Sequence, residues 1–429
     1  MGKISHALPG KKGKQVQFSE PLSADKAVAY DALVLDAKLR QSLVTVRSLG
    51  RHGLAVAALE TVGSVPTFFS RWCQQSLVCT ADEGTEMYLA YLERWLETSR
   101  ARVLITSSDG TIALLRRYRQ RIEDHNTRIA LAQEPALEIA VSKEQTLAVA
   151  QRLGMSVPRG AVIGSVQDVG AALKEIGLPA VVKPVESWLW GNQQGTRLAS
   201  HLVTTPDEAR QVVEALTCSG GTVLFQQLLS GRREAVSFFY AGGKIYARFA
   251  QWAKRMEPPL GGQSVFRQSI VVPEDIGCQA ENLIRAIDLE GYSEVEFRRD
   301  DAGVPYLMEI NPRLSASVEV AVQAGVDFPL LLYQWASGEA ITNVAGYRTG
   351  IWMRYLKGDI MTTIAALQQR GRPGVTPPAQ AILEFCLSFL QPTGYDYVDW
   401  EDLKPAMRAT LDFSRSWIGG AIKKRLSHI

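Results

Sequence analysis

The sequence predicts a protein of mixed α/β and α+β class, in which an open parallel sheet is followed by antiparallel strands and helices. Three observations lead to this prediction. Apolar strands alternate with helical segments in the first part of the chain, as in parallel sheets. Further along, the tight turns "AGGK" and "DDAG" each join two runs with strand periodicity, as in antiparallel hairpins. The 429 residues, of which 46% are apolar, are enough for two or three domains.

The first ordered part of the chain is predicted to be an α/β domain over residues 29–135. Residues 1–28 mix Lys, Gly, Ser and Pro without periodicity, and we expect a flexible leader there. A strand at 33–35, the loop "DAKLRQS", a helix to Gly50 and the strand "LAVAAL" then form a βαβ unit. The strand in "RVLITSSDG" and the helix "TIALLRRYRQRI" repeat the pattern. No G-x-G-x-x-G follows the first strand, which argues against a nicotinamide dinucleotide site.

Two further units and an extension follow. The helix "SKEQTLAVAQRLG" has Ser142 and Gln145 at capping-box spacing, and the strands "RGAVIG" and "PAVVKP", with helices after each, continue a unit at 136–225. The strand "GTVLFQQLLSG" leads into a unit at 226–345, in which the two hairpins flank a helix at about 274–289. Residues 346–429 predict a C-terminal extension with a strand in "GIWMRYL", a helix after Asp359, a Pro/Gly loop and a helical tail.

Composition excludes several classes of function. The net charge of +3 is too small to favour nucleic acid as the main partner. The five cysteines are scattered without metal-binding spacing, so we expect buried thiols in a reducing compartment. No apolar stretch reaches the ~20 residues of a membrane helix, and the first residues lack the apolar core of a signal peptide. We therefore expect a cytoplasmic protein without membrane insertion.

The run "PYLMEINPRLS" ends a predicted strand with polar residues, which predicts a cation site. Strict alternation would place Leu307, Glu309 and Asn311 on one face of this strand. Glu296 lies on the preceding strand of the same hairpin, and the three oxygen-bearing side chains converge if their faces coincide. Hard oxygen ligands without His or Cys favour magnesium over zinc. The alternative is a solvated strand face with an ordinary ion pair.

Two lysines are candidates for binding phosphate. Lys183 ends the apolar run "PAVVKP", where an ammonium group leaves a core strand, and Lys143 opens a helix whose first amides favour an anion. Magnesium bound by carboxylates commonly also holds substrate phosphates. After Lys183, the segment "WLWGNQQG" has two glycines, at 191 and 195, that bracket a polar loop, which we expect to cover a triphosphate; its tryptophans would otherwise anchor packing.

The order of these motifs resembles the ATP-grasp superfamily, in particular its carbamoyl-phosphate-synthase-like and biotin-carboxylase-like branch of carboxylate-amine ligases. The motifs are "SKEQTLA", "VVKP", the glycine loop, "LFQQLLSG", "VEFRRD" and "YLMEINPR", within residues 30–345. The resemblance implies an ATP-grasp fold behind an N-terminal pre-ATP-grasp domain, with 136–225 and 226–345 as the two subdomains that clasp ATP. It also implies an enzyme that uses ATP with magnesium, or manganese, to activate a small carboxylic acid as an acyl phosphate for attack by an amine or another nucleophile.

The resemblance assigns roles by position. Lys143 and Lys183 would contact the ATP phosphates, and Glu234 would reach the ribose. The backbone of the hinge would hydrogen-bond adenine, through Gln226, Gln227, Leu228 and Leu229. The magnesium ligands would be Glu296, Glu309 and Asn311.

Two arginines are predicted to take part in catalysis. Arg313 would stabilise the transferred phosphoryl group, since a planar guanidinium suits charge that develops on phosphate oxygens. Arg267, in "GGQSVFRQS", is a second candidate for phosphate or the substrate carboxylate, with a structural salt bridge as the alternative. Three predicted loops, "DAKLRQS", "TSSDG" and "KRMEPPLGGQS", supply the substrate-binding candidates Arg40, Asp109 and Arg255. The alternative for each is a loop cap or a surface charge.

The sequence leaves three hypotheses for the function open. The first is a carboxylate-amine ligase that releases ADP and phosphate. The second is a bicarbonate-using carboxylase or a carbamoyl-phosphate-type synthetase; a carboxylase would need its biotin carrier on another chain, because no Met-Lys-Met run is present. The third is a nucleotide-binding regulator without turnover. A homodimer is compatible with each of these readings.

Overall fold

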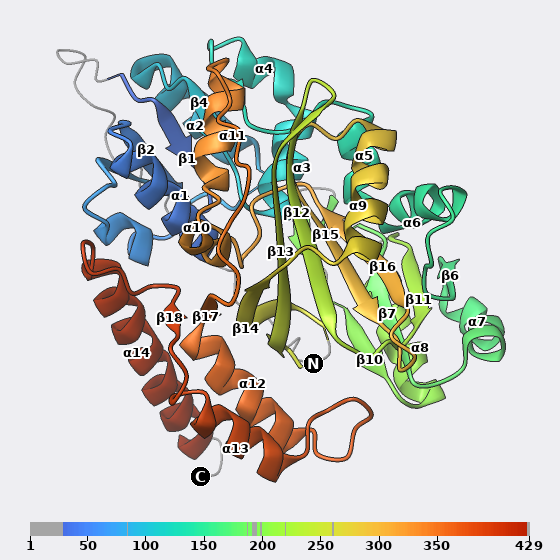
Figure 1. Ribbon diagram of the computed structural model, residues 1–429. Helices are drawn as coiled ribbons and strands as arrows, with labels where there is room; N and C mark the ends of the chain where they lie inside the picture. The colour runs from blue at the N-terminus through green and yellow to red at the C-terminus, as the bar shows by residue number, and fades with distance from the viewer. Residues whose placement is uncertain are drawn as a thin grey trace, which may run out of the picture.

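The computed structural model describes residues 29–426, except 84, 187, 191–194, 198–199, 219 and 260. The predicted leader at 1–28 lies outside the described residues, and so does most of the predicted phosphate loop after Lys183. Figure 1 shows the N-terminal domain at the upper left, a large sheet in the centre, a small lobe at the right and the C-terminal helices along the lower left.

The N-terminal domain is the open parallel sheet that the sequence predicts. Its five strands lie in the order β3-β2-β1-β4-β5, and every pairing is parallel. The strand order changes direction between β1 and β4, so the loops after these strands face a common crevice. The strands are β1 (Ala32–Val34), β2 (Val56–Glu60), β3 (Gln75–Val78), β4 (Val103–Ile105) and β5 (Arg128–Ile129). The helices are α1 (Arg40–Arg51), the 3-10 turn η1 (Pro66–Phe69), α2 (Glu86–Ser99), α3 (Asp109–Arg117) and α4 (Arg119–Glu123).

The small lobe is an antiparallel sheet in the order β10-β7-β11-β6, with its own apolar core beneath two helices. Its strands are β6 (Gly160–Ile163), β7 (Ala180–Pro184), β10 (His201–Val203) and β11 (Val223–Gln227), and a separate strand pair is formed by β8 (Trp188–Trp190) and β9 (Gly195–Arg197). The covering helices are α7 (Val169–Ile176), which follows the short turn η2 (Val166–Asp168), and α8 (Pro206–Thr217). The preceding helices, α5 (Ala136–Val141) and α6 (Lys143–Arg152), contribute apolar side chains to the core of the large sheet instead.

The large sheet has seven strands in the order β16-β15-β12-β13-β14-β17-β18. Both predicted hairpins are confirmed: one turns between Ala241 and Lys244, where two glycines have positive φ angles, and the other turns after Asp300. The strands are β12 (Arg233–Ala241), β13 (Lys244–Glu257), β14 (Gln263–Ile270), β15 (Gly291–Arg299) and β16 (Pro305–Asn311). The helices of this part are α9 (Glu274–Ile287), α10 (Glu319–Ala324) and α11 (Phe328–Ser337).

One strand of the large sheet differs from the sequence prediction. The segment "KRMEPPLGGQS" is expected to be a loop, but β13 continues to Glu257 and β14 begins at Gln263, antiparallel to it. Gly262 has a φ angle of +143°, and a side chain there would meet the carbonyl oxygen of Glu257 at 2.4 Å. Most of the expected loop is therefore strand, and Arg255 lies on β13.

The C-terminal extension completes the edge of the large sheet. Its strand β17 (Trp352–Arg354) pairs with β14, and β18 (Gly394–Tyr395) pairs with β17. Its helices are α12 (Leu356–Gln368), α13 (Pro378–Leu387) and α14 (Lys404–Leu426), which lie along the bottom of Figure 1. The predicted strand and helices of this region are confirmed, with α12 beginning three residues before Asp359.

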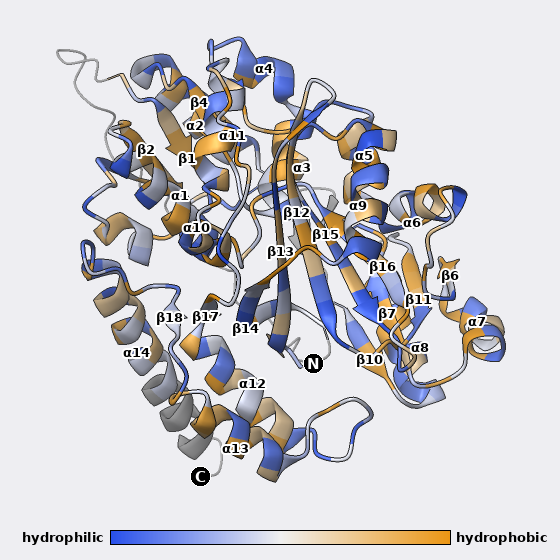
Figure 2. Cartoon of the chain, in the orientation of Figure 1, coloured by the Kyte–Doolittle hydropathy of each residue, from blue (hydrophilic) through white to orange (hydrophobic). Residues whose placement is uncertain are grey.

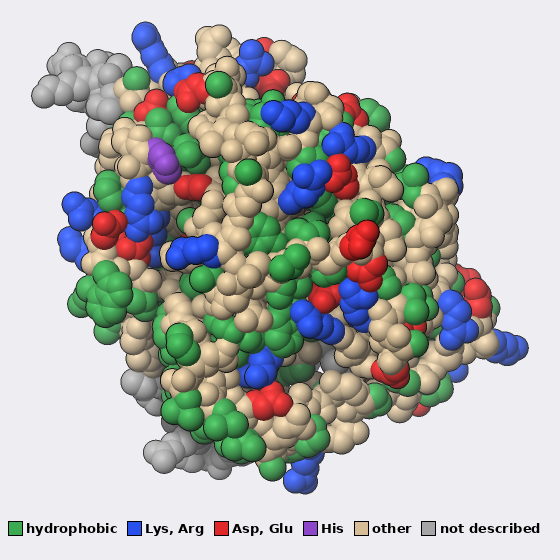
Figure 3. All heavy atoms as spheres, viewed as in Figure 1, with side chains coloured by type: hydrophobic (Ala, Val, Ile, Leu, Met, Phe, Trp, Pro, Cys, Tyr) green, Lys and Arg blue, Asp and Glu red, His purple; other side chains and the backbone are tan. Residues whose placement is uncertain are grey.

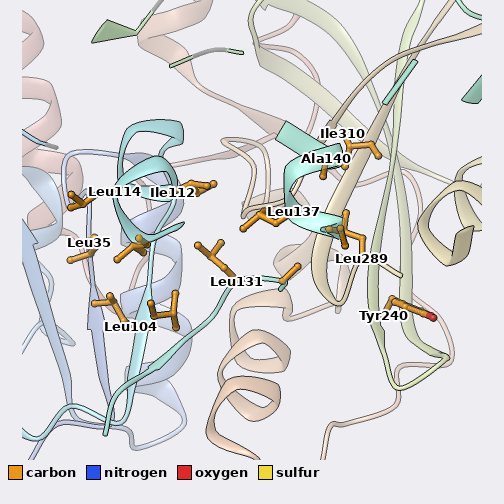
Figure 4. Packing of buried hydrophobic residues seen from close by; sticks show 14 of the residues in the cluster. Leu35, Leu104, Ile112, Leu114, Leu131, Leu137, Ala140, Tyr240, Leu289 and Ile310 are labelled. Atoms are coloured by element: carbon orange, nitrogen blue, oxygen red, sulfur yellow. The ribbon is translucent and has the colours of Figure 1, made fainter. Parts of the chain in front are cut away.

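A continuous apolar core joins the N-terminal domain to the large sheet. Figure 4 shows Leu35 and Leu104 of the N-terminal sheet, Leu131 and Leu137 of the connection, and Ile310 of β16 within one packed cluster. Figure 2 shows that interior elements such as β1 and α11 are largely apolar, whereas α4 at the surface is hydrophilic. The strand that carries the predicted metal ligands is therefore fixed relative to the N-terminal domain.

Buried ion pairs tie the extension to the N-terminal domain. Arg47 of α1, 2% exposed, donates from Nε to Oδ2 of Asp402 at 3.0 Å and from Nη2 to the Asp402 carbonyl at 2.8 Å. The Asp402 carboxylate also accepts the Ser70 hydroxyl at 2.6 Å and the Arg71 amide at 2.9 Å. Nearby, Arg51 pairs with Glu401 at 3.2 Å on the surface, where the Glu401 side chain is 66% exposed.

Not all of the cysteines are buried, contrary to the expectation from the sequence. Three cysteines, Cys218, Cys278 and Cys386, are exposed rather than buried, because each lies on the solvent side or the end of a helix.

Near the bottom of Figure 3, where α13 lies, hydrophobic side chains gather at the surface, and Ile382 and Leu383 are among the exposed ones. In the part of the chain that the structure describes, none of the helices combines the length and apolar character needed to span a bilayer.

Asp402→Asn is expected to lower the free energy of unfolding by about 3 kcal/mol, because it leaves the buried Arg47 without its closest counter-charge. The matched control is Glu401→Gln, which removes an exposed ion pair and is expected to cost less than about 0.5 kcal/mol. Urea denaturation of both variants measures the difference. Equal losses in the two variants would show that the buried contact does not fasten the extension.

Candidate functional site

The hairpin of β15 and β16 brings the three predicted metal ligands together on one face. Glu296 lies directly opposite Glu309, and Glu294 lies opposite Asn311. Asn311 Nδ2 donates to Glu296 Oε1 at 3.0 Å. Between Glu296 and Phe297 the register shifts, so Met308 is an extra residue and Leu307, fully buried, pairs with Phe297. The alternation expected for this strand is therefore wrong at Leu307, which packs in the apolar core, and holds from Glu309 to Asn311.

Glu296 is already neutralised by an arginine that sequence reasoning missed. Arg233, at the start of β12, donates from Nε to Glu296 Oε2 at 2.8 Å and from Nη2 to Oε1. Burial alone would raise the pKa of Glu296, but the Arg233 guanidinium outweighs it and lowers that pKa below its ordinary value. Burial would lower the pKa of Arg233, whereas Glu296 raises it, so this ion pair is fully charged at neutral pH. In the sequence, "GRREAV" shows only a basic residue at a strand start.

A second acid lies behind the first. Glu294, 1% exposed, accepts from Gln251 Nε2 at 2.8 Å and from the Ser317 hydroxyl at 3.3 Å. Burial raises its pKa, and the neighbouring charge of Glu296 raises it further. The two carboxylates therefore differ: the pKa of Glu296 is lowered by Arg233, whereas the pKa of Glu294 is raised by burial and by Glu296.

The two predicted lysines lie at the same place. Lys143 is the first residue of α6, whose cap Ser142 accepts the Gln145 amide at 3.3 Å, and its Nζ is 3.8 Å from Glu309 Oε2. Lys183 of β7 is 5% exposed, and its pKa is lowered to about 8. Burial is the main cause, Lys143 acts in the same direction, and Glu309 opposes the shift. A small cavity of about 50 Å³ lies beside Lys143, Glu309 and Asn311.

Arg313 connects this face to the N-terminal domain. Its Nε donates to Oδ1 of Asp109 at 2.6 Å, and Asp109 is the first residue of α3. Burial would lower the pKa of Arg313, but the Asp109 carboxylate outweighs burial and raises it, so the guanidinium stays charged. Asp109 also lines the small cavity beside Glu309, so the loop after β4 reaches the site.

Two predicted residues are not brought into this cluster. Arg267 is fully buried on β14, where its Nη2 donates to Asp396 Oδ1 at 2.7 Å. Glu234 follows Arg233 on β12 and so faces the opposite side of the sheet, where it accepts from Arg299 Nε at 2.7 Å and pairs with Arg232 at 3.0 Å. The roles assigned to Arg267 and Glu234 stay predictions.

The other substrate-binding candidates are also engaged. Arg40 donates from Nη2 to Gln263 Oε1 at 2.8 Å and from Nη1 to Asp396. Arg255 donates from Nε to Asp359 Oδ1 at 2.5 Å. Of the candidates in these loops, Asp109 is the one that lines the cavity beside Glu309.

The predicted hinge has an unsatisfied group that fits a nucleobase. Gln226 is 1% exposed, and its Nε2 has no hydrogen-bond partner among the described residues. Gln227 pairs with Arg159 through its amide at 2.9 Å, and the Leu229 carbonyl accepts from Arg298 Nη1 at 3.3 Å. A buried amide without a partner costs free energy, which a bound base with a ring-nitrogen acceptor would recover.

The oxygen ligands at Glu296 and Glu309 fit a magnesium ion that also binds water and phosphate oxygens. Two carboxylates and the side-chain oxygen of Asn311 are hard ligands on one face. Among the described residues, no group of three or more acidic, His or Cys side chains is placed to enclose a metal ion. Such an open set suits magnesium that also carries water and phosphate, and the ion would share Glu296 with Arg233.

A family model and two known proteins match parts of this chain. Residues 247–358 match the family model described as "ATP-grasp in the biosynthetic pathway with Ter operon". The chain is 26% identical over 220 residues to the carbamoyl phosphate synthase large chain of Methanoculleus marisnigri, covering 49% of this chain and 20% of that protein. It is also 26% identical over 219 residues to the D-alanine–D-alanine ligase of Pseudomonas entomophila, covering 46% of this chain and 64% of that protein. The chain thus spans less than two thirds of the length of these relatives.

Solved structures confirm the fold. The biotin carboxylase of Campylobacter jejuni, described as a β-γ-ATP complex, matches with a TM-score of 0.59 and 16% identity, covering 75% of this chain and 74% of that chain. The ATP-grasp fold that the motifs predicted is therefore confirmed.

Lys183→Met is expected to raise the free energy of unfolding at about pH 7 by about 2–3 kcal/mol, because the fold holds the pKa of this buried ammonium at about 8, below its ordinary value of 10.5. The unfolded chain binds this proton more tightly, so the wild type gains stability as the pH rises from about 8 towards 10.5, and the difference between the two proteins shrinks.

Urea denaturation at about pH 7 and about pH 10 measures this difference. The control is Lys174→Met, which changes an exposed lysine of α7 and is expected to leave the free energy of unfolding nearly unchanged. A stability difference for Lys183→Met that is the same at both pH values would contradict the depressed pKa.

Proposed function

We propose that this ATP-grasp chain is an ATP-dependent ligase that activates a small carboxylic acid and joins it to an amine or another nucleophile. The γ-phosphoryl group of ATP passes to the acid to give an acyl phosphate and ADP, and attack by the nucleophile then releases phosphate. The observation that carries the proposal is the pairing of Glu296 with Glu309 on one face, with Asn311 beside them and the ammonium of Lys143 3.8 Å from Glu309.

The chain's own residues would bind and orient the nucleotide. Lys143 brings both its ammonium and the first amides of α6 to the phosphates, and the buried Lys183 adds a second positive charge. Nearby phosphate would favour the charged form of Lys183 and raise its pKa from about 8. Glu296, Glu309 and Asn311 would hold magnesium, which when bound neutralises charge on the phosphate oxygens. In the same proposal, Gln226 and the hinge backbone would bind adenine.

Arg313 is the residue proposed to act on the group in transfer. Asp109 accepts from the Nε of Arg313 at 2.6 Å, and the Nη groups of Arg313 would bind the phosphoryl oxygens. A charged, planar group that is fixed before the reaction stabilises developing charge without reorganisation. Arg267 would serve a separate purpose at the acid if it left Asp396, its partner in this structure. We place the enzyme in the cytoplasm, where its ATP is available.

The second candidate is a bicarbonate-using carboxylase or a carbamoyl-phosphate-type synthetase. The matches to a carbamoyl phosphate synthase large chain and to the fold of a biotin carboxylase favour it. The match to a D-alanine–D-alanine ligase, which covers more of that relative, favours the first candidate. The two differ in substrate: the second would release ADP with bicarbonate and without an organic acid. A nucleotide-binding regulator would release none.

ADP release in a matrix of carboxylic acids against amines tests the proposal. We expect at least one pair to raise the rate at least about tenfold over ATP alone, and Glu309→Gln to reduce that rate at least about 100-fold, because it removes an anionic ligand while conserving volume. The control is Glu281→Gln on α9, whose carboxylate pairs with Arg248 and Arg285 and which is expected to keep full activity.

Each other outcome has a defined meaning. Stimulation by bicarbonate alone would replace the first candidate with the second. Wild-type rates in Glu309→Gln would remove Glu309 from the metal site. Bound ATP without ADP release from any substrate in the matrix would favour the regulator.

A further inference from the structure

A second, larger cavity lies between the N-terminal domain and the C-terminal extension. Its volume is about 420 Å³, and its walls come from the loops after β1 and β2, the start of α12, β18 and α14. Cavities that bind small molecules are commonly found between domains and at the carboxyl ends of parallel strands. The matched family model ends at residue 358 and so does not include the walls that come from β18 and α14.

This cavity shares no lining residue with the small cavity beside Glu309. Asp396, in its wall, follows β18 at one edge of the large sheet, whereas Glu309 lies on β16 at the other edge. Six strand spacings of about 4.8 Å separate these two edge strands along the sheet. A small molecule in this cavity would therefore contact other residues than one held beside Glu309.

The walls of the cavity are largely aromatic and apolar. Tyr355, Tyr395, Tyr397 and Phe413 line it, together with aliphatic residues of both domains. Burial raises the pKa of Tyr355 and of Tyr397, so both phenols stay neutral at physiological pH. The rings of Tyr355 and Tyr397 lie 6.1 Å apart at 59°, which gives a tilted aromatic surface. Such walls favour a ligand with an aromatic or aliphatic body.

Ion pairs cancel most of the charge in these walls. Asp396 is held by Arg267 at 2.7 Å and by Arg40, and Asp412 is held by Arg408 at 2.6 Å. Lys38 is held by Glu83 at 2.6 Å. The acidic groups therefore have cationic partners before any ligand binds, and they attract no amine.

One positive charge in the wall has no acidic partner among the described residues. Lys357 lines the cavity, is exposed, and forms no ion pair with any residue that the structure describes; its Nζ lies 5.9 Å from the centre of the Phe413 ring. It is the second residue of α12, a helix of 13 residues whose cap, Tyr355, makes no side-chain hydrogen bond to the first turn. The positive end of this helix and the ammonium group together favour an anion at this end of the cavity.

We propose that this cavity binds a small organic anion, with an aromatic or aliphatic body against the tyrosines and its acidic group beside Lys357 and the first turn of α12. This site lies outside the proposed ATP site, and its existence does not depend on the ligase activity. A ligand there would contact both the N-terminal domain and the extension, and so would stabilise their association.

Ligand-observed NMR with three chosen probes tests the proposal on the whole chain. The probes are 3-phenylpropionate, hexanoate and the cation phenethylamine, whose ring and chain match those of phenylpropionate. We expect both carboxylates to bind and phenethylamine to bind at least about tenfold more weakly, because the uncompensated charge is positive. Binding of ADP, measured separately in each variant, shows whether the nucleotide site is intact. A failure of the cavity proposal can thereby be told from a failure of the proposed ligase function.

Two variants locate the binding. Lys357→Gln changes an exposed residue and is expected to weaken 3-phenylpropionate at least about fivefold, whereas the control Lys404→Gln, at an exposed lysine that does not line the cavity, is expected to have no effect. Ala409→Trp, which fills the cavity from α14, is expected to abolish binding. Absence of carboxylate binding, equal binding of phenethylamine, or undiminished binding in both Lys357→Gln and Ala409→Trp would overturn the proposal.

Discussion

The pairing of Glu296 with Glu309 across the β15–β16 hairpin is the constraint on which the rest of the site depends. Like charges directly opposite one another destabilise a sheet, so this pair needs positive charge around it. Arg233 supplies it to Glu296, and Lys143 supplies it to Glu309. The surrounding cations are thus explained by the register of one hairpin, and a divalent cation would relieve the same repulsion more completely.

The site is assembled from separate parts of the chain, and packing keeps them in register. The large sheet provides the carboxylates, the small lobe provides Lys183, and α3 of the N-terminal domain holds Arg313 through Asp109. One apolar core runs from the N-terminal sheet to Ile310, between the two ligands on β16. The extension adds an edge to the same sheet and is fastened by Asp402 to α1. A change in any of these contacts would shift charges at the site.

Local sequence signals predicted the hairpins, the parallel domain and the convergence of Glu296, Glu309 and Asn311, because turn residues and alternation act over a few positions. Features that depend on pairing were not predictable. Arg233 looks like any basic residue until β12 is set beside β15, and Glu234 falls on the opposite face by a shift of one position. Met308 forms a bulge that alternation alone does not predict. The extension of β13 to Glu257 depends on its pairing with β14, which the local sequence does not show.

Binding of Mn²⁺, followed by electron paramagnetic resonance with and without an unreactive ATP analogue, tests most directly whether the paired carboxylates are a metal–nucleotide site. We expect weak binding of Mn²⁺ alone, because Arg233 already occupies Glu296, and binding at least about tenfold tighter with the analogue, because phosphate oxygens complete the ligand set. Glu309→Gln should lose this gain. The same Mn²⁺ affinity with and without the analogue, or an unchanged gain in Glu309→Gln, would contradict the assignment.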